Sequence, residues 1–400
     1  MEFDPTLCCG CGACANVCPT GAITWQRDPQ GFAVPEIAQD KCVNCGLCRK
    51  VCPYEHTHVG VQADPKVYAA LHRDPAVVKA SSSGGVVTAL SDWILDQGGV
   101  VYGVAFDEHF LPCYRRAETK EQRNAFRGSK YVQCDGAAVF PQVEADLRQG
   151  RRVMFTGTPC QVSGLKAALA VKKAPMEGLY TVDNICHGAA SPKVLQSYLD
   201  YIRGKVLRDS HILGFSMRSK DTAWQRQDVK CVTGAGDESR VLNDTASWNK
   251  LYLTTYATRE SCFHCRFTSY ERVGDLTLAD YWNVENAGIR LDYSGGVNLV
   301  LVNSPKGADW FRACQDSLRW QSSDKKSCWQ IHLERPTVYT EKRAAFWTEF
   351  QADPQATVAK YARGSRFNAM TRVLSPILRK LGVYTLAVRL LSTVKGHGRQ

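Results

Sequence analysis

The sequence predicts a mixed α/β (α+β) protein with a small cysteine-rich domain at its start and a helical tail at its end. Half of the 18 cysteines fall within the first sixty residues. From there to about residue 303, stretches with the apolar pattern of strands alternate with stretches of helical pattern. The final segment is apolar and basic. The expected domains are residues 1–60, 66–190, 191–350 and 355–400.

Length and composition fit a globular protein of two or three folded units. The chain has 400 residues, of which 44% are hydrophobic and 22% charged, and these are ordinary values for globular proteins. The start "MEFDPTLCC" lacks the basic and apolar regions of a signal peptide, and no apolar run reaches ~18 residues. Cysteines in such a chain favour metal ligation or redox chemistry over disulfides. We therefore expect a cytoplasmic location.

The first sixty residues contain one cysteine pattern twice. "CCGCGACANVCP" and "CVNCGLCRKVCP" each contain the spacing C-x2-C-x2-C-x3-C-P, which is that of bacterial two-cluster ferredoxins. In that arrangement the fourth cysteine of each run ligates the other cluster. One [4Fe–4S] cluster is therefore expected on Cys8, Cys11, Cys14 and Cys52, and the second on Cys42, Cys45, Cys48 and Cys18. Cys9 lies outside the spacing and has no assigned role.

Zinc or disulfides are the alternatives for these cysteines. Zinc usually takes two separated pairs of ligands, which explains neither the third cysteine of each run nor the Cys-Pro ending. The pattern favours iron–sulfur clusters.

The body that follows is expected to alternate between strands and helices. Strands are predicted over 66–73, 100–106, 151–157, 179–186, 211–218, 275–282 and 296–303. Helices are predicted over 83–99, 138–150, 161–170 and 191–205. The alternation indicates an α/β layer, and the shorter strands beyond residue 205 indicate a more mixed second half.

Two predicted turns from strand to helix carry polar residues. In "SSSGGVVTAL", residues Ser82 to Gly85 stand at a helix start, where hydroxyls and backbone N–H groups either bind a phosphate or only cap the helix. In "FTGTPCQ", Cys160 stands at another helix start, which favours a thiolate. No GxGxxG motif is followed by an acidic residue, so a Rossmann dinucleotide site has no support.

Several motifs in order resemble one family. These are "SSSGGVVTAL", "RGSKYVQ", "FTGTPCQVSGLKA", "VDNICHGAASPKVLQSYL", "RESCFHCRF" and "DLTLADYW". Together with the cysteine array, they resemble the beta-subunit family of coenzyme F420 hydrogenases and dehydrogenases, in the bacterial form with a fused N-terminal ferredoxin. The resemblance runs from the array to about Asn303.

The resemblance implies FAD and a third [4Fe–4S] cluster in the body. It places that cluster on Cys160, Cys186, Cys262 and Cys265. Cys262 and Cys265 have the spacing of a metal-binding pair, but a pair alone also fits zinc or two buried thiols. Cysteines without a partner spacing are expected to be ordinary buried residues. They are Cys113, Cys134, Cys231, Cys314 and Cys328.

The resemblance also assigns flavin-binding residues in the body. The expected cofactor contacts are Ser82, Ser83, Gly84, Gly85, Gly128, Ser129, Lys130, Tyr131, Gly157, Thr158, Asp183 and Asn184. Without the resemblance, "RGSKY" would be read as a surface loop. The expected catalytic residues are His187 and Lys130. His187 either donates a proton or caps the next helix.

These features predict a flavin- and iron–sulfur-dependent oxidoreductase. Flavin is the group that couples one-electron clusters to a two-electron substrate. The expected donor is ferredoxin or another redox protein. The expected substrate is coenzyme F420 or another small or lipid-linked molecule, including one from surface-polysaccharide biosynthesis. No nucleic acid is expected, and the chain acts alone, as a homo-oligomer or in a larger redox complex. The alternative is an electron-transfer subunit that feeds a separate catalytic chain.

The C-terminal segment carries much of the net charge of +11. From Pro354 to Gln400 there are nine basic residues and no acidic one. We expect its main helix from about Ser375. This helix either packs on the body with a solvated basic face or lies on anionic lipid at the inner face of the membrane.

Overall fold

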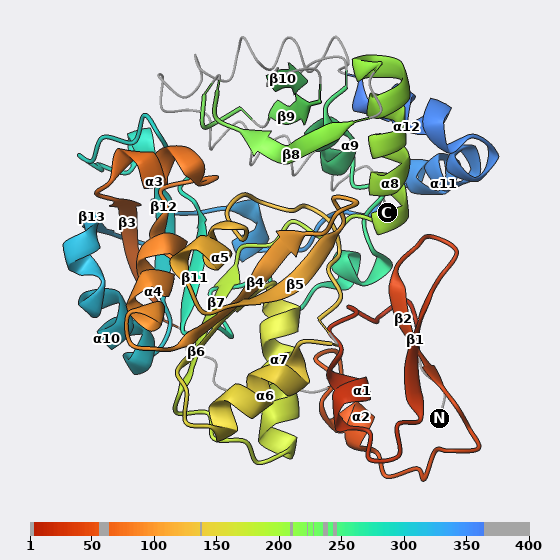
Figure 1. The fold of residues 1–400 in the computed structure, drawn as a ribbon, viewed down its shortest axis with the longest axis horizontal. Coiled ribbons are helices and arrows are strands. Elements are labelled where there is room, and N and C mark those ends of the chain that lie inside the picture. Colours follow the sequence, from red (N-terminus) through yellow and green to blue (C-terminus); the bar gives the residue numbers. More distant parts are fainter. Residues whose placement is uncertain are drawn as a thin grey trace.

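The computed structural model describes most of the chain up to residue 363. The described residues are 4–55, 64–136, 138–208, 211–221, 223–226, 228–234, 239–242 and 246–363. They form an N-terminal module, a large central sheet with helices on both faces, and a smaller sheet with its own helices (Figure 1). The predicted mixed α/β class is confirmed.

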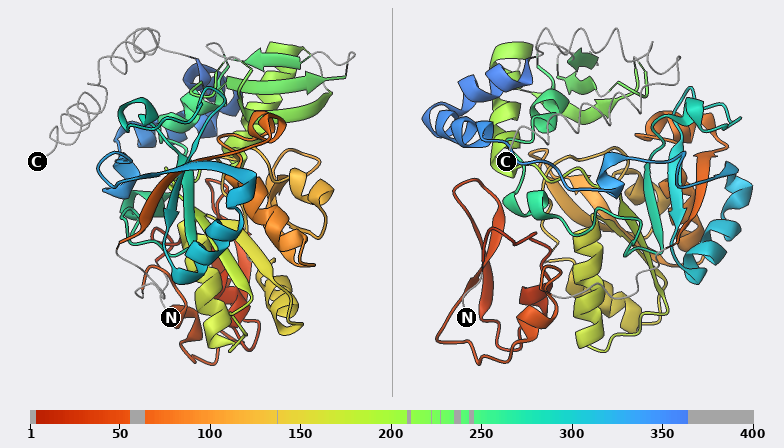
Figure 2. Two further views of the ribbon diagram at one scale, coloured as in Figure 1. Left: turned by 90° about the vertical axis from the view of Figure 1, so that its left-hand side faces the viewer. Right: turned by 180° about the vertical axis from the view of Figure 1, so that it is seen from behind.

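The N-terminal module combines a hairpin with two short helices. The strands β1 (Ile23–Arg27) and β2 (Ala33–Ile37) pair antiparallel. The helices α1 (Ala13–Val17) and α2 (Leu47–Lys50) follow Gly12 and Gly46, whose φ values of 92° and 74° lie in the left-handed region that favours glycine. The module lies beside the long helix α7 (Pro159–Val171) of the body in Figures 1 and 2.

The central sheet has eight strands in the order β13-β3-β12-β11-β7-β6-β4-β5. Their bounds are β3 (Lys66–His72), β4 (Val100–Phe106), β5 (Pro112–Ala117), β6 (Val153–Gly157), β7 (Leu179–Asn184), β11 (Leu276–Asp280), β12 (Asn298–Val302) and β13 (Leu318–Ser323). Strands β4, β6, β7 and β11 are parallel neighbours, and the other pairings are antiparallel. A domain boundary was expected between residues 190 and 191. The sheet crosses it, because β11 and β12 from the second expected domain lie between β7 and β3 from the first.

Helices cover both faces of this sheet because its buried strands alternate their side chains. Val101 and Met154 share one core with α4 (Val86–Leu95) and α10 (Pro305–Ala313). Tyr102 and Phe155 point the other way, into a core with α6 (Phe140–Arg148) and α7. The period of two thus places one apolar layer on each face. The short helices α3 (Pro75–Ala80) and α5 (Lys120–Asn124) complete this part.

A second core lies under the smaller sheet. Strands β8 (Ile212–Ser219), β9 (Asp228–Thr233) and β10 (Ser239–Leu242) pair antiparallel. The helices are α8 (Pro192–Tyr201), which continues as a π-helical turn (Ile202–Leu207), α9 (Trp248–Leu253), α11 (Lys342–Ala352) and α12 (Pro354–Ala362). Val358 and Ala362 are fully buried, so α12 belongs to the core. The expected tail can therefore begin only after this helix, and from residue 364 onward it lies outside the described residues.

Every strand and helix predicted between residues 66 and 303 is present. Four short 3₁₀ helices were not predicted: Glu260–His264, Val284–Asn286, Gln315–Ser317 and Ile331–Leu333. Strands β5, β9, β10 and β13 were also missed. In β5 and β13, polar residues break the apolar pattern that marks a buried strand. In the described part of the chain, no helix combines the length and apolarity needed to span a bilayer.

Candidate functional site

The expected site residues gather at one edge of the central sheet. Cys160 and Cys186 follow the ends of the parallel strands β6 and β7. Strand β3 runs in the same direction as β11, because both pair antiparallel with β12. Its end, which leads into the turn at Ser82, therefore lies at the same edge. Ligands of α/β sheets commonly bind at the carboxyl ends of the strands.

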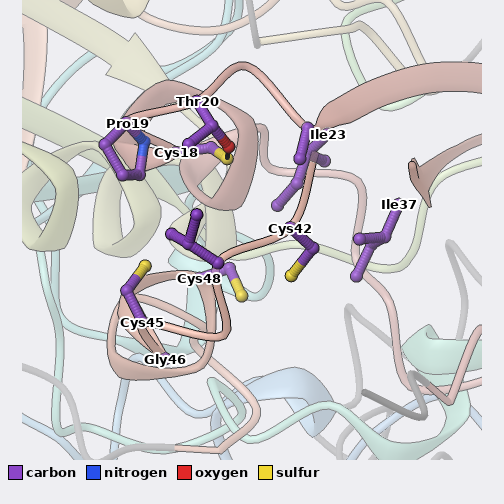
Figure 3. A pocket seen from close by; sticks show the side chains of 11 residues that line it. Cys18, Pro19, Thr20, Ile23, Ile37, Cys42, Cys45, Gly46 and Cys48 are labelled. Carbon is purple, nitrogen blue, oxygen red and sulfur yellow. Dashed lines mark hydrogen bonds between the residues drawn. The ribbon is translucent and has the colours of Figure 1, made fainter. Parts of the chain in front are cut away.

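The outermost cysteine group is the four-residue set expected for the second ferredoxin cluster. Figure 3 shows that its side chains surround one cavity, and they come from the end of α1, the loop before α2, and α2 itself. Cys45 is exposed. We call this group the outer set: Cys18, Cys42, Cys45 and Cys48.

A neighbouring cavity is lined by the set expected for the first ferredoxin cluster. We call this group the inner set: Cys8, Cys11, Cys14 and Cys52. Burial is the main cause that raises the pKa of the Cys14 thiol to about 12, and the nearby Cys8 and Cys52 thiols contribute to this shift. The two cavities share Cys48 in their walls. Buried thiols of this kind release their protons readily only when a cation binds to the sulfur.

The third set lines a cavity between the N-terminal module and the central sheet. We call this group the body set: Cys160, Cys186, Cys262 and Cys265. Burial raises the pKa of Cys262 to about 12 and that of Cys265 to about 11, and the thiol of Cys160 contributes to both shifts. The four residues come from three segments far apart in the chain, and the structure brings them together.

Cys9, which the sequence left unassigned, lies between two of these sets. It lines both the inner cavity and the body cavity. Its thiol interacts with the thiols of Cys11 in the inner set and Cys160 in the body set. Gly164 lets α7 lie close to the inner set, because a Cβ at this position would stand 2.8 Å from the Cys11 sulfur.

A buried ion pair holds the segments that carry the body set. Asp183 accepts hydrogen bonds from Arg272 Nη2 (2.9 Å), Thr277 Oγ1 (2.6 Å) and the Gly274 amide (2.9 Å). Arg272 also donates to the carbonyls of Phe267 at 2.6 Å and Asn184 at 2.9 Å. It thus ties the residues just before Cys186 to those just after Cys265. Asp183, expected at the flavin, has its hydrogen bonds within the protein.

The cysteine sets fit four-iron clusters in their chemistry. All 18 cysteines are free thiols. In the described residues no three His, Cys, Asp or Glu side chains converge on a point as a single ion requires, whereas the ligands of a cubane stand apart around it. The buried side-chain amide of Gln133 is a second feature that fits an iron–sulfur cluster. Its Oε1 accepts from Ala33 N at 3.1 Å, and its Nε2, beside Gly10, has no hydrogen-bond partner in the described structure. Cluster sulfurs accept such donors.

A fourth cavity contains the two loops expected to bind flavin. It is lined by Ser82, Ser83 and Gly85 from one loop and by Gly128, Ser129 and Tyr131 from the other. The loops are joined, because Ser82 Oγ accepts from Ser129 N at 2.8 Å and from Ser129 Oγ at 3.0 Å. Ser83 Oγ donates to the Val297 carbonyl at 2.8 Å. Gly85 has a φ of 81° at the start of α4.

Gly84 differs from its neighbours in this loop. It is not among the residues that line the cavity. A Cβ at Gly84 would stand 2.6 Å from the Ala70 carbonyl oxygen and 2.9 Å from the Asn298 amide nitrogen. Since both are backbone atoms of the sheet, Gly84 is required for packing, and a larger residue there would disturb the fold whether or not flavin binds.

Arg127 is a candidate ligand-binding residue that the sequence did not single out. It lines the fourth cavity with Ser82 and Ser129, and its buried Nε has no hydrogen-bond partner in the described structure. Burial lowers the pKa of Arg127, and the nearby Arg123 lowers it further. Arg123 itself pairs with Asp92 at 2.7 Å. The signal was present in "FRGSKY", where Arg127 directly precedes the predicted loop.

The two residues expected to be catalytic occupy different surroundings. Lys130 Nζ donates to three carbonyls at the end of α5, at 2.9 to 3.2 Å, and burial lowers its pKa to about 8. Burial lowers the pKa of His187 to about 4, so its ring is neutral near pH 7. His187 lies 4.2 Å from the His332 ring, measured between centroids. At neutral pH, then, His187 can donate an N–H hydrogen bond but is not a charged acid.

The remaining expected contacts lie where the third and fourth cavities meet. Asn184 and Tyr131 line both cavities, while Gly157 and Thr158 line the third. Tyr131 stacks on Tyr252, with ring centroids 5.0 Å apart. Thr158 caps α7 by a reciprocal pairing with Gln161, which fixes the turn that carries Cys160.

The wall of the fourth cavity also contains residues that the sequence did not suggest. Arg218 pairs with Asp280, with Nη1 2.5 Å and Nη2 3.1 Å from the carboxylate oxygens. Its guanidinium lies over Trp282, which stacks on Trp224. Asp280 and Trp282 lie in the motif "DLTLADYW", but nothing in that motif assigned them a role, and Arg218 comes from β8, outside every quoted motif.

Protein-family models match three parts of this chain. Residues 7–56 match the model of the 4Fe-4S dicluster domain. Residues 67–140 match the N-terminal model of the coenzyme F420 hydrogenase/dehydrogenase beta subunit, and residues 150–327 match its C-terminal model. These two models together cover more than half of the chain. No curated protein sequence matches it significantly. A chain of the F420-reducing [NiFe] hydrogenase complex from Methanosarcina barkeri superposes with a TM-score of 0.47 at 17% identity, covering 76% of this chain and 92% of that one.

Proposed function

The chain belongs to the coenzyme F420 hydrogenase/dehydrogenase beta-subunit family and is an iron–sulfur electron-transfer protein, and on that premise we propose that it is an FAD-dependent oxidoreductase with three [4Fe–4S] clusters. It passes electrons between a one-electron donor such as ferredoxin and a two-electron substrate. The proposal rests on one observation: four cavities follow one another through the molecule with shared walls.

The order of the cavities is given by the residues they share. The outer and inner cavities share Cys48, and the inner and body cavities share Cys9 and Tyr54. The body cavity and the fourth cavity share Tyr131 and Asn184 among others. The series therefore runs from the exposed Cys45 to the interior edge of the central sheet.

In the proposal each cysteine set holds one cluster, and the fourth cavity holds FAD. Bound clusters transfer single electrons, and bound flavin exchanges an electron pair with an organic substrate. The chain contributes twelve thiol ligands and burial around the inner and body sets, which limits contact with water. Tyr54 strengthens the join between these two sets, because its hydroxyl donates to the Ser261 carbonyl at 2.7 Å, one residue before Cys262.

The basic and hydroxyl groups of the fourth cavity suit the flavin diphosphate. Arg127 provides a guanidinium whose Nε has no hydrogen-bond partner in the described structure, and the Ser82–Ser129 pair provides hydroxyls beside the start of α4. Helix starts and arginines both favour phosphate groups. The stacked pair Tyr131 and Tyr252 adds a flat aromatic surface to the same wall.

The substrate is coenzyme F420 or another organic molecule, including a sugar or a lipid-linked intermediate. Its side of the fourth cavity contains Trp282, the Arg218–Asp280 pair and His187. Since His187 is neutral near pH 7, it can orient a substrate oxygen or nitrogen by a hydrogen bond. The charge of Arg218 is balanced by Asp280, so this wall favours polar or aromatic groups over a free anion.

The test is anaerobic reconstitution of the full-length protein with iron, sulfide and FAD. We expect about 12 irons, at four for each of three clusters, and one FAD per chain. Reduced ferredoxin should then bleach the flavin absorbance, and added coenzyme F420 should be reduced by the protein alone. A yield of about 8 irons, or no bound flavin, would refute the cofactor assignment. Full cofactors without turnover of any two-electron acceptor would favour a subunit that feeds a separate catalytic chain.

A further inference from the structure

Arg259 of the body reaches into the N-terminal module between two cysteine sets. It directly precedes the 3₁₀ helix that carries Cys262, and its own amide donates to the Ala189 carbonyl at 2.9 Å. Its guanidinium donates to the carbonyl of Cys8 and to that of Ala33, the latter at 3.0 Å. The group lies over the Phe32 ring, 5.3 Å from the centroid. Arg259 is only 3% exposed.

The charge of this guanidinium is not compensated by a carboxylate. In the described residues no Asp or Glu forms an ion pair with Arg259, and its hydrogen-bond partners are neutral carbonyls. Burying a charge without an opposite charge is costly. A nearby anion would explain why the sequence keeps an arginine in this position.

This charge lies near cysteines of two different sets, because Arg259 is bound to the backbone of Cys8 in the inner set and lines the cavity of the body set. Arg259 acts electrostatically on Cys8 of the inner set and on Cys160 and Cys262 of the body set. A four-iron cluster held by four thiolates is negatively charged, and its net charge is one of the factors that set its reduction potential. Adding an electron makes the cluster more negative. A fixed positive charge therefore stabilises the reduced form.

We propose that Arg259 is a positioning residue that places one uncompensated positive charge between the inner and body clusters and raises the reduction potentials of both. The inference rests on the three-cluster assignment of the proposed function. The same charge reduces the repulsion between the two clusters. Arg259 also joins the two sets mechanically, because its backbone belongs to the body and its side chain is bound to the module.

Arg343 provides a matched control. It is also buried, at 6% exposed, and also joins the module to the body, through Gln30 Oε1 at 2.7 Å and the Thr258 carbonyl at 3.0 Å. Its charge, however, is paired with Glu260 at 3.3 Å. The variant Arg343→Lys alters these interface contacts and keeps the charge, whereas removal of the charge would leave Glu260 as an unpaired anion two residues before Cys262.

The experiment is a redox titration, monitored by electron paramagnetic resonance, of reconstituted full-length protein and the variants Arg259→Gln, Arg259→Lys and Arg343→Lys. In Arg259→Gln we expect the equilibrium constants for one-electron reduction of the inner and body clusters to fall about tenfold. This corresponds to a fall of ~59 mV in each reduction potential, while the potential of the outer cluster is unchanged. Arg259→Lys and Arg343→Lys should keep wild-type potentials. Signals are assigned with Cys45→Ser for the outer cluster and Cys262→Ser for the body cluster.

Unchanged potentials in Arg259→Gln at full iron content would overturn the proposal. Equal shifts in Arg259→Lys and Arg259→Gln would also overturn it, because contacts rather than charge would then be responsible. If Arg259→Gln cannot hold its clusters, Arg259→Lys decides. Full iron content with wild-type potentials in Arg259→Lys supports the role of the positive charge. Loss of iron or shifted potentials in Arg259→Lys refutes that role. A wild-type protein with only two clusters would instead be a failure of the proposed function.

Discussion

The pair formed by Asp183 and Arg272 offers a test that links stability to the body set. Both side chains are fully buried, with 0% and 1% of their surfaces exposed. The change Asp183→Asn keeps the size of the side chain but removes its charge, which leaves the Arg272 guanidinium buried without an anion. It also places an amide N–H₂ where the carboxylate accepts from Thr277 and Gly274.

The expected cost follows from this geometry. Breaking a buried ion pair by removing one partner destabilises a protein by about 3–5 kcal/mol. The hydrogen bonds from Arg272 to the carbonyls of Phe267 and Asn184 depend on the position of the guanidinium. Because these carbonyls flank the body set, Asp183→Asn should also loosen the third cluster, so that iron falls from about 12 to about 8 per chain at four irons per cluster.

The assay combines urea unfolding with iron quantitation, and Asp275→Asn is the control. Asp275 is a buried carboxylate directly before β11, where it accepts from Thr181 N at 2.9 Å, Thr181 Oγ1 at 2.7 Å and Ser304 Oγ at 2.7 Å. It has no arginine partner in the described residues. We expect Asp275→Asn to cost about 1–3 kcal/mol and to retain all of the iron.

One outcome would show that this reasoning is wrong. If Asp183→Asn lost no more stability than Asp275→Asn and kept its full iron, the ion pair would not organise the body set. Loss of stability with full iron would separate the two claims and confine the role of Asp183 to folding.

Five further changes test other parts of the molecule. Cys262→Ser should remove about 4 of about 12 irons and leave the ferredoxin-type signals, as measured by iron content and electron paramagnetic resonance. Arg127→Gln should lower the flavin content while the iron content stays constant. Gly84→Ala should overpack the sheet and lower the free energy of unfolding by about 1–3 kcal/mol, in the apoprotein as well as in the loaded protein. Burial lowers the pKa of His332 from 6.5 to about 3, so the folded state binds fewer protons than the unfolded state. The free energy of unfolding should therefore fall as the pH drops below about 6.5. His332→Leu should flatten this fall between pH 7.5 and 5.5. Truncation after Arg363 should preserve the unfolding midpoint and abolish sedimentation with anionic liposomes, and equal sedimentation of both forms would exclude lipid binding by the tail.

Local patterns in the sequence were sufficient for much of the fold. Strands such as β6 and β7 and helices such as α4 and α7 were predicted because their apolar periods are written in consecutive residues. The sheet order was not predictable in this way. Nothing local to β11 or β12 shows that they insert between β7 and β3, since strand order depends on long-range packing.

The outer and inner sets illustrate what the sequence by itself determined. Their ligands lie within short loops, so spacing alone limits which thiols can surround a common centre, and the structure brings the same eight cysteines to two adjacent cavities. The body set was inferred only through resemblance, because its members are separated by up to about a hundred residues.

Only the tertiary structure decided the roles of the residues between these sets. Arg259, Gln133 and Arg127 lie in the motifs "RESCFHCRF" and "RGSKYVQ" but belong to no ligand spacing, and their importance comes from side-chain atoms that are buried beside groups contributed by other segments. Asp183 was expected at the cofactor; it lines the fourth cavity, and its carboxylate is bound to Arg272, far along the chain. A short motif records the groups that must be neighbours in sequence. The balance of buried charges depends on which distant segments meet, and that is settled only when the chain folds.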